Sequence, residues 1–140
     1  GFLAQYLYAT QAARNLFKYD NYYQDYDLFP DSNGILLSGP ISYFNLEKGE
    51  IKPLNGSLGG ENAGSVSISP DGKHFAYVKF SYEDDVVDVM KVFSFSDSSS
   101  TYVPNSEACY SPGWSPDSKR IAYLFKQDIW MKELSTFLNK

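Results

Sequence analysis

The stretch Ser69-Pro70-Asp71-Gly72-Lys73-His74-Phe75-Ala76-Tyr77 returns later in the chain as Ser115-Pro116-Asp117-Ser118-Lys119-Arg120-Ile121-Ala122-Tyr123. Pro70 and Pro116 are 46 residues apart (116 − 70). A weaker third copy, Phe29-Pro30-Asp31-Ser32-Asn33-Gly34-Ile35-Leu36-Leu37, has its proline 40 residues upstream of Pro70 (70 − 30). Self-similarity at a nearly constant spacing predicts that the chain builds one structural unit several times.

Each copy has the chemistry of a tight hairpin turn. Proline fixes the backbone φ angle at the first turn position, and the aspartate side chain can bond back to its own backbone. Gly72 and Ser118 occupy the position where the backbone is tightest. The composition includes 12 tyrosines and 10 phenylalanines, an aromatic bias that favours strands on either side of these turns.

A further strand, apolar on both faces, follows each hairpin. Sheets that stack face to face bury both of their sides, as propeller blades do, and a four-stranded blade repeats roughly every 40–45 residues. In the first copy, the turn at 47–50 leads into a short outer strand at 51–54. Pro53 is tolerated there because an edge strand need not donate on its outer side. The three strands after the hairpins are expected at 41–46, 87–93 and 128–134.

These stretches resemble the WD-repeat-like propeller motif of TolB-type proteins, whose blades read W-S-P-D-G-K-x-I-A-Y, then a D-I-W strand, then a T-G-E turn. The matching segments are Trp114 to Tyr123, Asp128 to Trp130, and Glu47 to Glu50. The resemblance covers about residues 24–138. It implies an all-β fold, a partial β-propeller of about three four-stranded antiparallel blades. The first copy departs from the motif, with two leucines where Ala-Tyr stands in the others.

The expected organisation is an N-terminal helical segment at 1–22 followed by propeller blades over 23–140. The blades are expected at about 23–60, 63–106 and 109–140. Apolar residues between Phe2 and Lys18 recur at three- and four-residue steps, which predicts an amphipathic helix. This helix could end a membrane anchor, cover the propeller or bind a partner; packing on its own domain is preferred.

The charge balance argues against nucleic acid as a partner. The chain has 12 Lys and Arg against 17 Asp and Glu, a net charge of -5, and no basic cluster that could neutralise a row of phosphates. Cys109 is the only cysteine and is interpreted as a partly buried small hydrophobe. We predict no cofactor, no metal and no membrane span in this chain, with a periplasmic or extracellular location favoured.

One stretch resembles a catalytic motif, but we do not assign it to catalysis. Gly113-Trp114-Ser115-Pro116-Asp117 begins like a nucleophile elbow, but that motif needs a second glycine where Asp117 stands. A serine hydrolase also needs a histidine base, and His74, the only histidine, lies on a hairpin strand where it is expected to face solvent. The chain is therefore predicted not to be an enzyme.

The segment from Ser81 to Asp85 is expected to join two strands of the middle blade, on the face where propellers commonly gather partners. Tyr82, Glu83, Asp84 and Asp85 form our predicted partner-binding loop. Adjacent exposed carboxylates are usually only solvated, so we do not assign them to glycoside cleavage.

The leading functional hypothesis is a non-enzymatic binding scaffold of the cell envelope, with a protein, a peptide or a carbohydrate as its partner. The alternative is the substrate-gating propeller of a serine peptidase that resembles prolyl oligopeptidase or dipeptidyl peptidase, with the catalytic domain elsewhere. Closed propellers use about 4–8 blades. Three blades leave faces uncovered, so we also expect copies of the chain to associate into a homo-oligomer.

Overall fold

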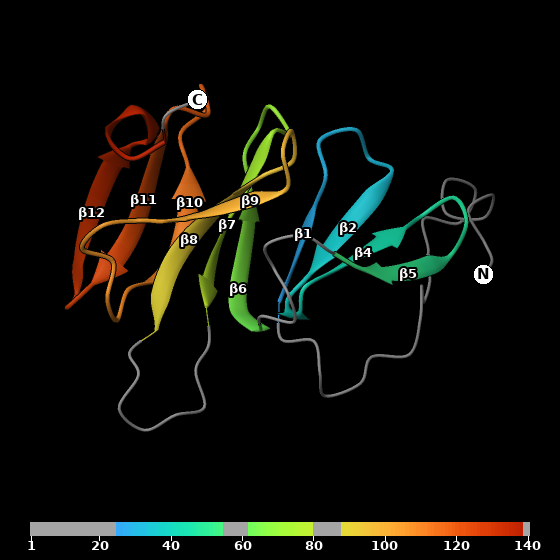
Figure 1. Cartoon of the computed structure of the whole chain (residues 1–140), viewed down its shortest axis with the longest axis horizontal. Coiled ribbons are helices and arrows are strands. Elements are labelled where there is room, and N and C mark those ends of the chain that lie inside the picture. Colours follow the sequence, from blue (N-terminus) through green and yellow to red (C-terminus); the bar gives the residue numbers. More distant parts are fainter. Residues whose placement is uncertain (1–24, 55–61, 80–87, 139–140) are drawn as a thin grey trace, which may run out of the picture.

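The structure is a computed structural model that describes residues 25–54, 62–79 and 88–138. The described strands form three antiparallel sheets, which follow one another in chain order and stand side by side like the blades of a fan (Figure 1). The predicted all-β class and partial propeller architecture are confirmed. The predicted N-terminal helix, at 1–22, lies outside the described residues.

The first sheet has four strands in the order β1-β2-β4-β5. Strand β5 is exposed along its whole length, as expected for an edge strand that contains Pro53. The turn before it places Gly49 at a φ of 67°, a conformation that favours glycine. The strand bounds are Tyr26–Leu28 (β1), Gly34–Leu37 (β2), Ser42–Asn45 (β4) and Glu50–Pro53 (β5).

The second sheet contains the middle repeat and has five strands, in the order β3-β6-β7-β8-β9. The extra strand, β3 (Gly39–Pro40), comes from the chain that leaves the first sheet, and it pairs with the start of β6. This short pairing links the two sheets and explains why the count exceeds the predicted four. The remaining bounds are Asn62–Ile68 (β6), His74–Lys79 (β7), Val89–Ser94 (β8) and Ser99–Tyr102 (β9).

The third sheet has three strands, β10 (Tyr110–Trp114), β11 (Arg120–Phe125) and β12 (Asp128–Glu133), followed by a short 3-10 turn at Leu134–Thr136. We expected the strand at 128–134 to be buried on both faces, and this is wrong. Ile129 is 77% exposed and Met131 is 57% exposed. In the described part of the chain no further strand or sheet lies against β12, so nothing covers its apolar side chains.

The three repeat copies form the same turn. Gly72, Ser118 and Ser32 have φ angles of 73°, 62° and 63°, all left-handed. In the second and third copies the serine before the proline bonds to the aspartate carboxylate, at 2.6 Å in both. The aspartate in turn accepts the N–H of the following lysine at 3.0 Å in both. The predicted hairpins, including the weaker first copy, are therefore confirmed in detail.

The second sheet is buried on both faces, as propeller packing predicts. Phe75 and Tyr77 on β7 face the first sheet and pack with Leu36. Ala76, between them, faces the third sheet and packs with Ile121. Side chains alternate between the two faces of a strand, so one strand supplies both cores.

Side chains near β1 of the first sheet also form hydrogen bonds to β6 of the second sheet. Asp27 on β1 accepts the backbone N–H of Ile68 on β6 at 2.6 Å, and Asp25 accepts that of Val66 at 3.2 Å. The turns are linked as well, because the Ser118 hydroxyl accepts the backbone N–H of Asp71 at 3.0 Å. These bonds fix each sheet against the next and hold the turns of neighbouring repeats together.

Candidate functional site

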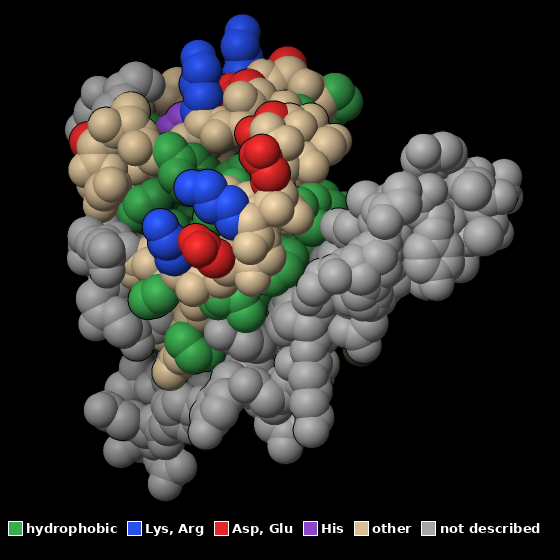
Figure 2. Space-filling model, turned by 90° about the vertical axis from the view of Figure 1, so that its right-hand side faces the viewer, with side chains coloured by type: hydrophobic (Ala, Val, Ile, Leu, Met, Phe, Trp, Pro, Cys, Tyr) green, Lys and Arg blue, Asp and Glu red, His purple; other side chains and the backbone are tan. Residues whose placement is uncertain are grey.

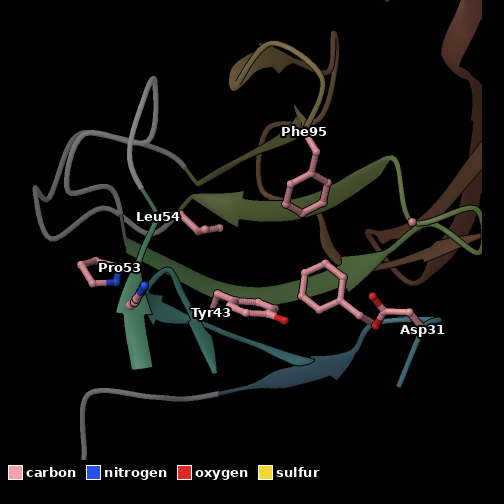
Figure 3. A pocket seen from close by; sticks show the side chains of 8 residues that line it. Asp31, Tyr43, Pro53, Leu54 and Phe95 are labelled. Carbon is pink, nitrogen blue, oxygen red and sulfur yellow. The ribbon is translucent and has the colours of Figure 1, made fainter. Parts of the chain in front are cut away.

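A pocket of about 480 Å³ opens at the seam between the first and second sheets. Asp31 lies at one end, Pro53 and Leu54 lie at the other, and Tyr43 and Phe95 lie between them (Figure 3). The first sheet and its turns supply most of the wall, and the second sheet and its turns supply Gly72 and Phe95. The complete lining is Phe29, Asp31, Tyr43, Lys52, Pro53, Leu54, Gly72 and Phe95.

Three aromatic rings form the apolar part of this pocket. The Phe29 ring lies 5.3 Å from Tyr43 at an interplanar angle of 73° and 5.6 Å from Phe95 at 57°. All three side chains are half-buried. Rings inclined steeply to one another present faces in different directions, so a ligand group placed here can meet more than one π surface.

Gly34 makes room for the Tyr43 ring. A Cβ atom added at Gly34 would lie 2.1 Å from Cε2 of Tyr43, which is too close for any real contact. The other two repeats have His74 and Arg120 at this position. The position of the Tyr43 ring therefore depends on a glycine that only the first repeat possesses.

The turn beside the pocket differs from the other two in its side chains. Asp31 Oδ1 accepts the backbone N–H of Asn33 at 2.9 Å, which preserves the shape of the turn. Phe29, however, stands where the other copies have serine, so the hydroxyl that bonds to the carboxylate in those copies is missing here. Asn33 stands where they have Lys73 and Lys119, so the neighbouring positive charge is missing as well.

The other two carboxylates are stabilised within their own turns. Two hydrogen bonds lower the pKa of Asp117 below its ordinary value: the larger effect comes from the Ser115 hydroxyl and the smaller one from the Lys119 N–H. For Asp71, burial acts in the opposite direction, but the bonds from Ser69 and Lys73 outweigh it, so the pKa of Asp71 is also lowered. In the second and third repeats, the turn itself therefore supplies the hydrogen bonds that stabilise the charged carboxylate.

The loop that we predicted to bind a partner, Tyr82, Glu83, Asp84 and Asp85, lies outside the described residues, and that prediction stays untested. The serine of the elbow-like stretch, Ser115, lies in a turn, where its hydroxyl donates to Asp117 and accepts the backbone N–H of Arg120. The repeat explains this serine fully.

His74 is not placed as we expected. Its ring is partly buried and stacks on Trp114, with the ring centroids 6.3 Å apart and an interplanar angle of 25°. The expectation that it faces solvent is therefore wrong, because the neighbouring sheet covers it. Cys109, in contrast, is buried, more completely than predicted, and burial raises the pKa of its thiol to about 11.

Neither a metal centre nor a membrane helix is found in the described part of the chain. Over residues 25–54, 62–79 and 88–138, no group of three or more His, Cys, Asp or Glu side chains could hold a metal ion. Over the same ranges, no helix is long and apolar enough to cross a bilayer.

On the side seen in Figure 2, hydrophobic side chains lie between basic and acidic ones, and neither sign of charge dominates the face.

Sequence reasoning missed the pocket. Phe29, Tyr43 and Phe95 come from separate elements, and only the fold brings them together. One usable signal was present, however: the first copy of the repeat departs from the other two at Phe29, Asn33 and Gly34. These three departures lie in or beside the pocket, whereas the departures at Leu36 and Leu37 lie in the hydrophobic core.

Comparison with solved structures identifies the architecture. The chain superimposes on a protein assigned as TolB from Agrobacterium tumefaciens with a TM-score of 0.74, at 19% identity, covering 91% of this chain and 48% of that one. It superimposes on TolB from Acinetobacter baumannii with a TM-score of 0.66, at 16% identity, covering 88% of this chain and 33% of that one. The tricorn protease gives a TM-score of 0.55 at 17% identity, covering 71% of this chain and 10% of that one.

The chain thus spans about half of the first of these proteins and a third of the second. No protein-family model and no curated protein sequence matches it. At these identities the likeness establishes the fold alone, which is that of consecutive blades of a TolB-type β-propeller.

Proposed function

We propose that this chain is a non-enzymatic propeller module that binds a protein or peptide partner in the cell envelope. The observation that carries the proposal is the aromatic pocket at the seam between the first two sheets. Tyr43 lies on strand β4, and Phe29 and Phe95 directly follow strands β1 and β8. The turn residue Asp31 and the edge residue Lys52 place charges at the margin of the pocket. Apolar walls with a few polar groups are typical of binding sites. The envelope location rests on analogy with TolB-type proteins.

The absence of catalysis is part of the proposal. Ser115 has its hydroxyl bonded within a turn, and His74 is stacked on Trp114 rather than placed beside a nucleophile. The Cys109 thiol is buried, and its raised pKa keeps it protonated near neutral pH, which makes it a poor nucleophile. These environments support a structural role for each group.

The test is selection of short peptides from a displayed random library on the whole immobilised protein. Peptides that bind the wild type should bind Phe95→Ala about tenfold more weakly, a loss of about 1.4 kcal/mol, because a wall of the pocket is removed. They should bind Ile129→Ser, on the far side of the third sheet, as they bind the wild type. Failure to enrich any peptide, or equal binding to both variants, would overturn the proposal. Exclusive selection of oligosaccharides in a parallel glycan screen would replace the peptide by a carbohydrate.

The likeness to the tricorn protease favours one second candidate, the substrate-gating propeller of a peptidase. In that case a hydrolase domain with its own G-x-S-x-G sequence should be encoded in the same gene. Sequencing the complete gene distinguishes the two proposals, since the scaffold needs no such domain.

Self-association is the remaining part of the proposal. Tyr26 and Leu28 on β1 are 65% and 55% exposed, and Ile129 and Met131 on β12 are 77% and 57% exposed. Each pair shares one face of its strand, because side chains alternate. We expect light scattering to show a particle larger than the 15.8 kDa chain, and Ile129→Asp to reduce it to a monomer. A wild type that stays monomeric at high concentration would exclude this association.

A further inference from the structure

We infer that the seam pocket receives a basic side chain, an arginine in an extended peptide, with its guanidinium group over the aromatic rings and directed toward Asp31. This inference rests on the proposed binding function and adds the chemistry of the ligand. It follows from the way in which the first repeat departs from the other two.

The first departure concerns charge. The second and third turns each contain an aspartate, a serine hydroxyl that bonds to it and a lysine next to it. The first turn keeps the aspartate, Asp31, and loses both partners, because Phe29 replaces the serine and Asn33 replaces the lysine. Asp31 lacks the lysine that stands next to the aspartate in the other two turns, so a ligand that supplies a cation is favoured beside its carboxylate.

The second departure concerns the surface beside that charge. The residue that replaces serine, Phe29, is the central ring of the aromatic group, 5.3 Å from Tyr43 and 5.6 Å from Phe95. Tyr43 can lie where it does because position 34 is glycine in this repeat alone. The change that removes the serine hydroxyl therefore also supplies a π surface, to which a cation is attracted.

Arginine fits this combination better than lysine does. A planar guanidinium group stacks on aromatic faces and is less strongly hydrated than an ammonium group, so it loses less when it enters a partly buried pocket. Its donors can then reach the carboxylate at the margin.

The positive charge of Lys52 determines which end of the pocket the guanidinium group occupies. Lys52 is paired directly across the strands with Tyr43 and precedes Pro53, which lies at the end of the pocket away from Asp31 (Figure 3). Its charge repels a cation from that end and favours the Asp31 end. Replacing Lys52 by Met should therefore strengthen binding of a basic peptide, by roughly two- to threefold.

The experiment is an NMR titration of the whole protein with an acetylated, amidated peptide, Gly-Gly-Arg-Gly-Gly, and with its citrulline counterpart. Citrulline has nearly the shape of arginine without its charge. The arginine peptide should shift the amide signals of Gly34 and Gly72 and bind about tenfold more tightly than the citrulline peptide. The lysine peptide should fall between them.

The matched variants are Asp31→Asn and Asp117→Asn. Each removes one negative charge from an equivalent turn, and at position 31 the amide oxygen can still accept the Asn33 N–H. Asp31→Asn should weaken binding of the arginine peptide roughly two- to fivefold, while Asp117→Asn should leave it unchanged. Equal losses in the two variants would mean general attraction to an acidic protein and would overturn the inference.

Equal binding of the arginine and citrulline peptides would also overturn it. If the peptides selected from the random library depend on Phe95 but contain no basic residue, the inference fails and the binding function stands. If no peptide of any composition binds at the seam, the proposed function fails with it.

Discussion

Trp114 on β10 donates its indole N–H to the main-chain carbonyl of Ser67 on β6, across a distance of 2.8 Å. The bond crosses from the third sheet to the second, so it joins two blades rather than two strands of one blade. This tryptophan opens the W-S-P-D motif of the third repeat, and its ring also stacks on His74. A residue that marks the repeat in sequence thus also holds neighbouring repeats together.

Trp114→Phe should destabilise the protein by about 0.5–1.5 kcal/mol, because the hydrogen bond from the indole to the Ser67 carbonyl across the blade interface is lost. Urea unfolding followed by circular dichroism measures the change. Trp130→Phe is the matched control, since Trp130 is 50% exposed on β12 and its replacement should have little effect. Equal losses in the two variants would show that the bond between the sheets contributes nothing specific.

Gly34→Ala should destabilise the protein and distort the pocket. The new Cβ would lie 2.1 Å from the Tyr43 ring, so the ring must leave its position, at a cost of about 1–3 kcal/mol. Gly113→Ala is the control, because a Cβ at Gly113 meets no atom within 4 Å. Thermal unfolding compares the two variants, and the NMR signals of the Tyr43 ring report its movement. An unmoved Tyr43 ring in Gly34→Ala would contradict the prediction.

The repeat made the fold predictable from sequence. Ser-Pro-Asp turns have strong local preferences, and their spacing alone indicated the size of a blade. Even the weak first copy was found, because Pro30, Asp31 and Ser32 keep the turn positions although the flanking residues differ.

What the sequence could not provide was burial. Ile129 and Met131 have the apolar pattern of a buried strand, but burial depends on a neighbouring sheet, which the strand itself does not encode. The pocket was missed for a related reason. Its rings belong to a turn, a strand and a loop that lie far apart in the chain, so no local pattern connects Phe29, Tyr43 and Phe95.

Ser115→Ala should raise the pKa of Asp117 toward its ordinary value, because the hydroxyl bond that stabilises the charged carboxylate is lost. Carbon-detected NMR titration of the aspartate side chains measures this directly. In the same variant the pKa of Asp71 should not change, since its hydroxyl donor is Ser69. The reciprocal variant, Ser69→Ala, should shift Asp71 and leave Asp117 in place. A common shift of both groups would indicate a general structural change instead.

Cys109 should make the protein less stable as the solution becomes alkaline. Burial raises the pKa of its thiol from 9.0 to about 11, so between these values the folded protein keeps a proton that the unfolded chain releases. Unfolding then releases protons, and the free energy of unfolding falls as the pH rises through this window. Below pH 9 the contribution is complete and constant. Urea titrations at several pH values should show that the free energy of unfolding declines more steeply with pH for the wild type than for Cys109→Ala.

The burial of the Cys109 thiol can also be tested by chemical labelling. Ellman's reagent should react slowly with the folded protein at pH 8 and rapidly in urea. Parallel declines in the two proteins, together with fast labelling of the folded state, would mean that the thiol is accessible.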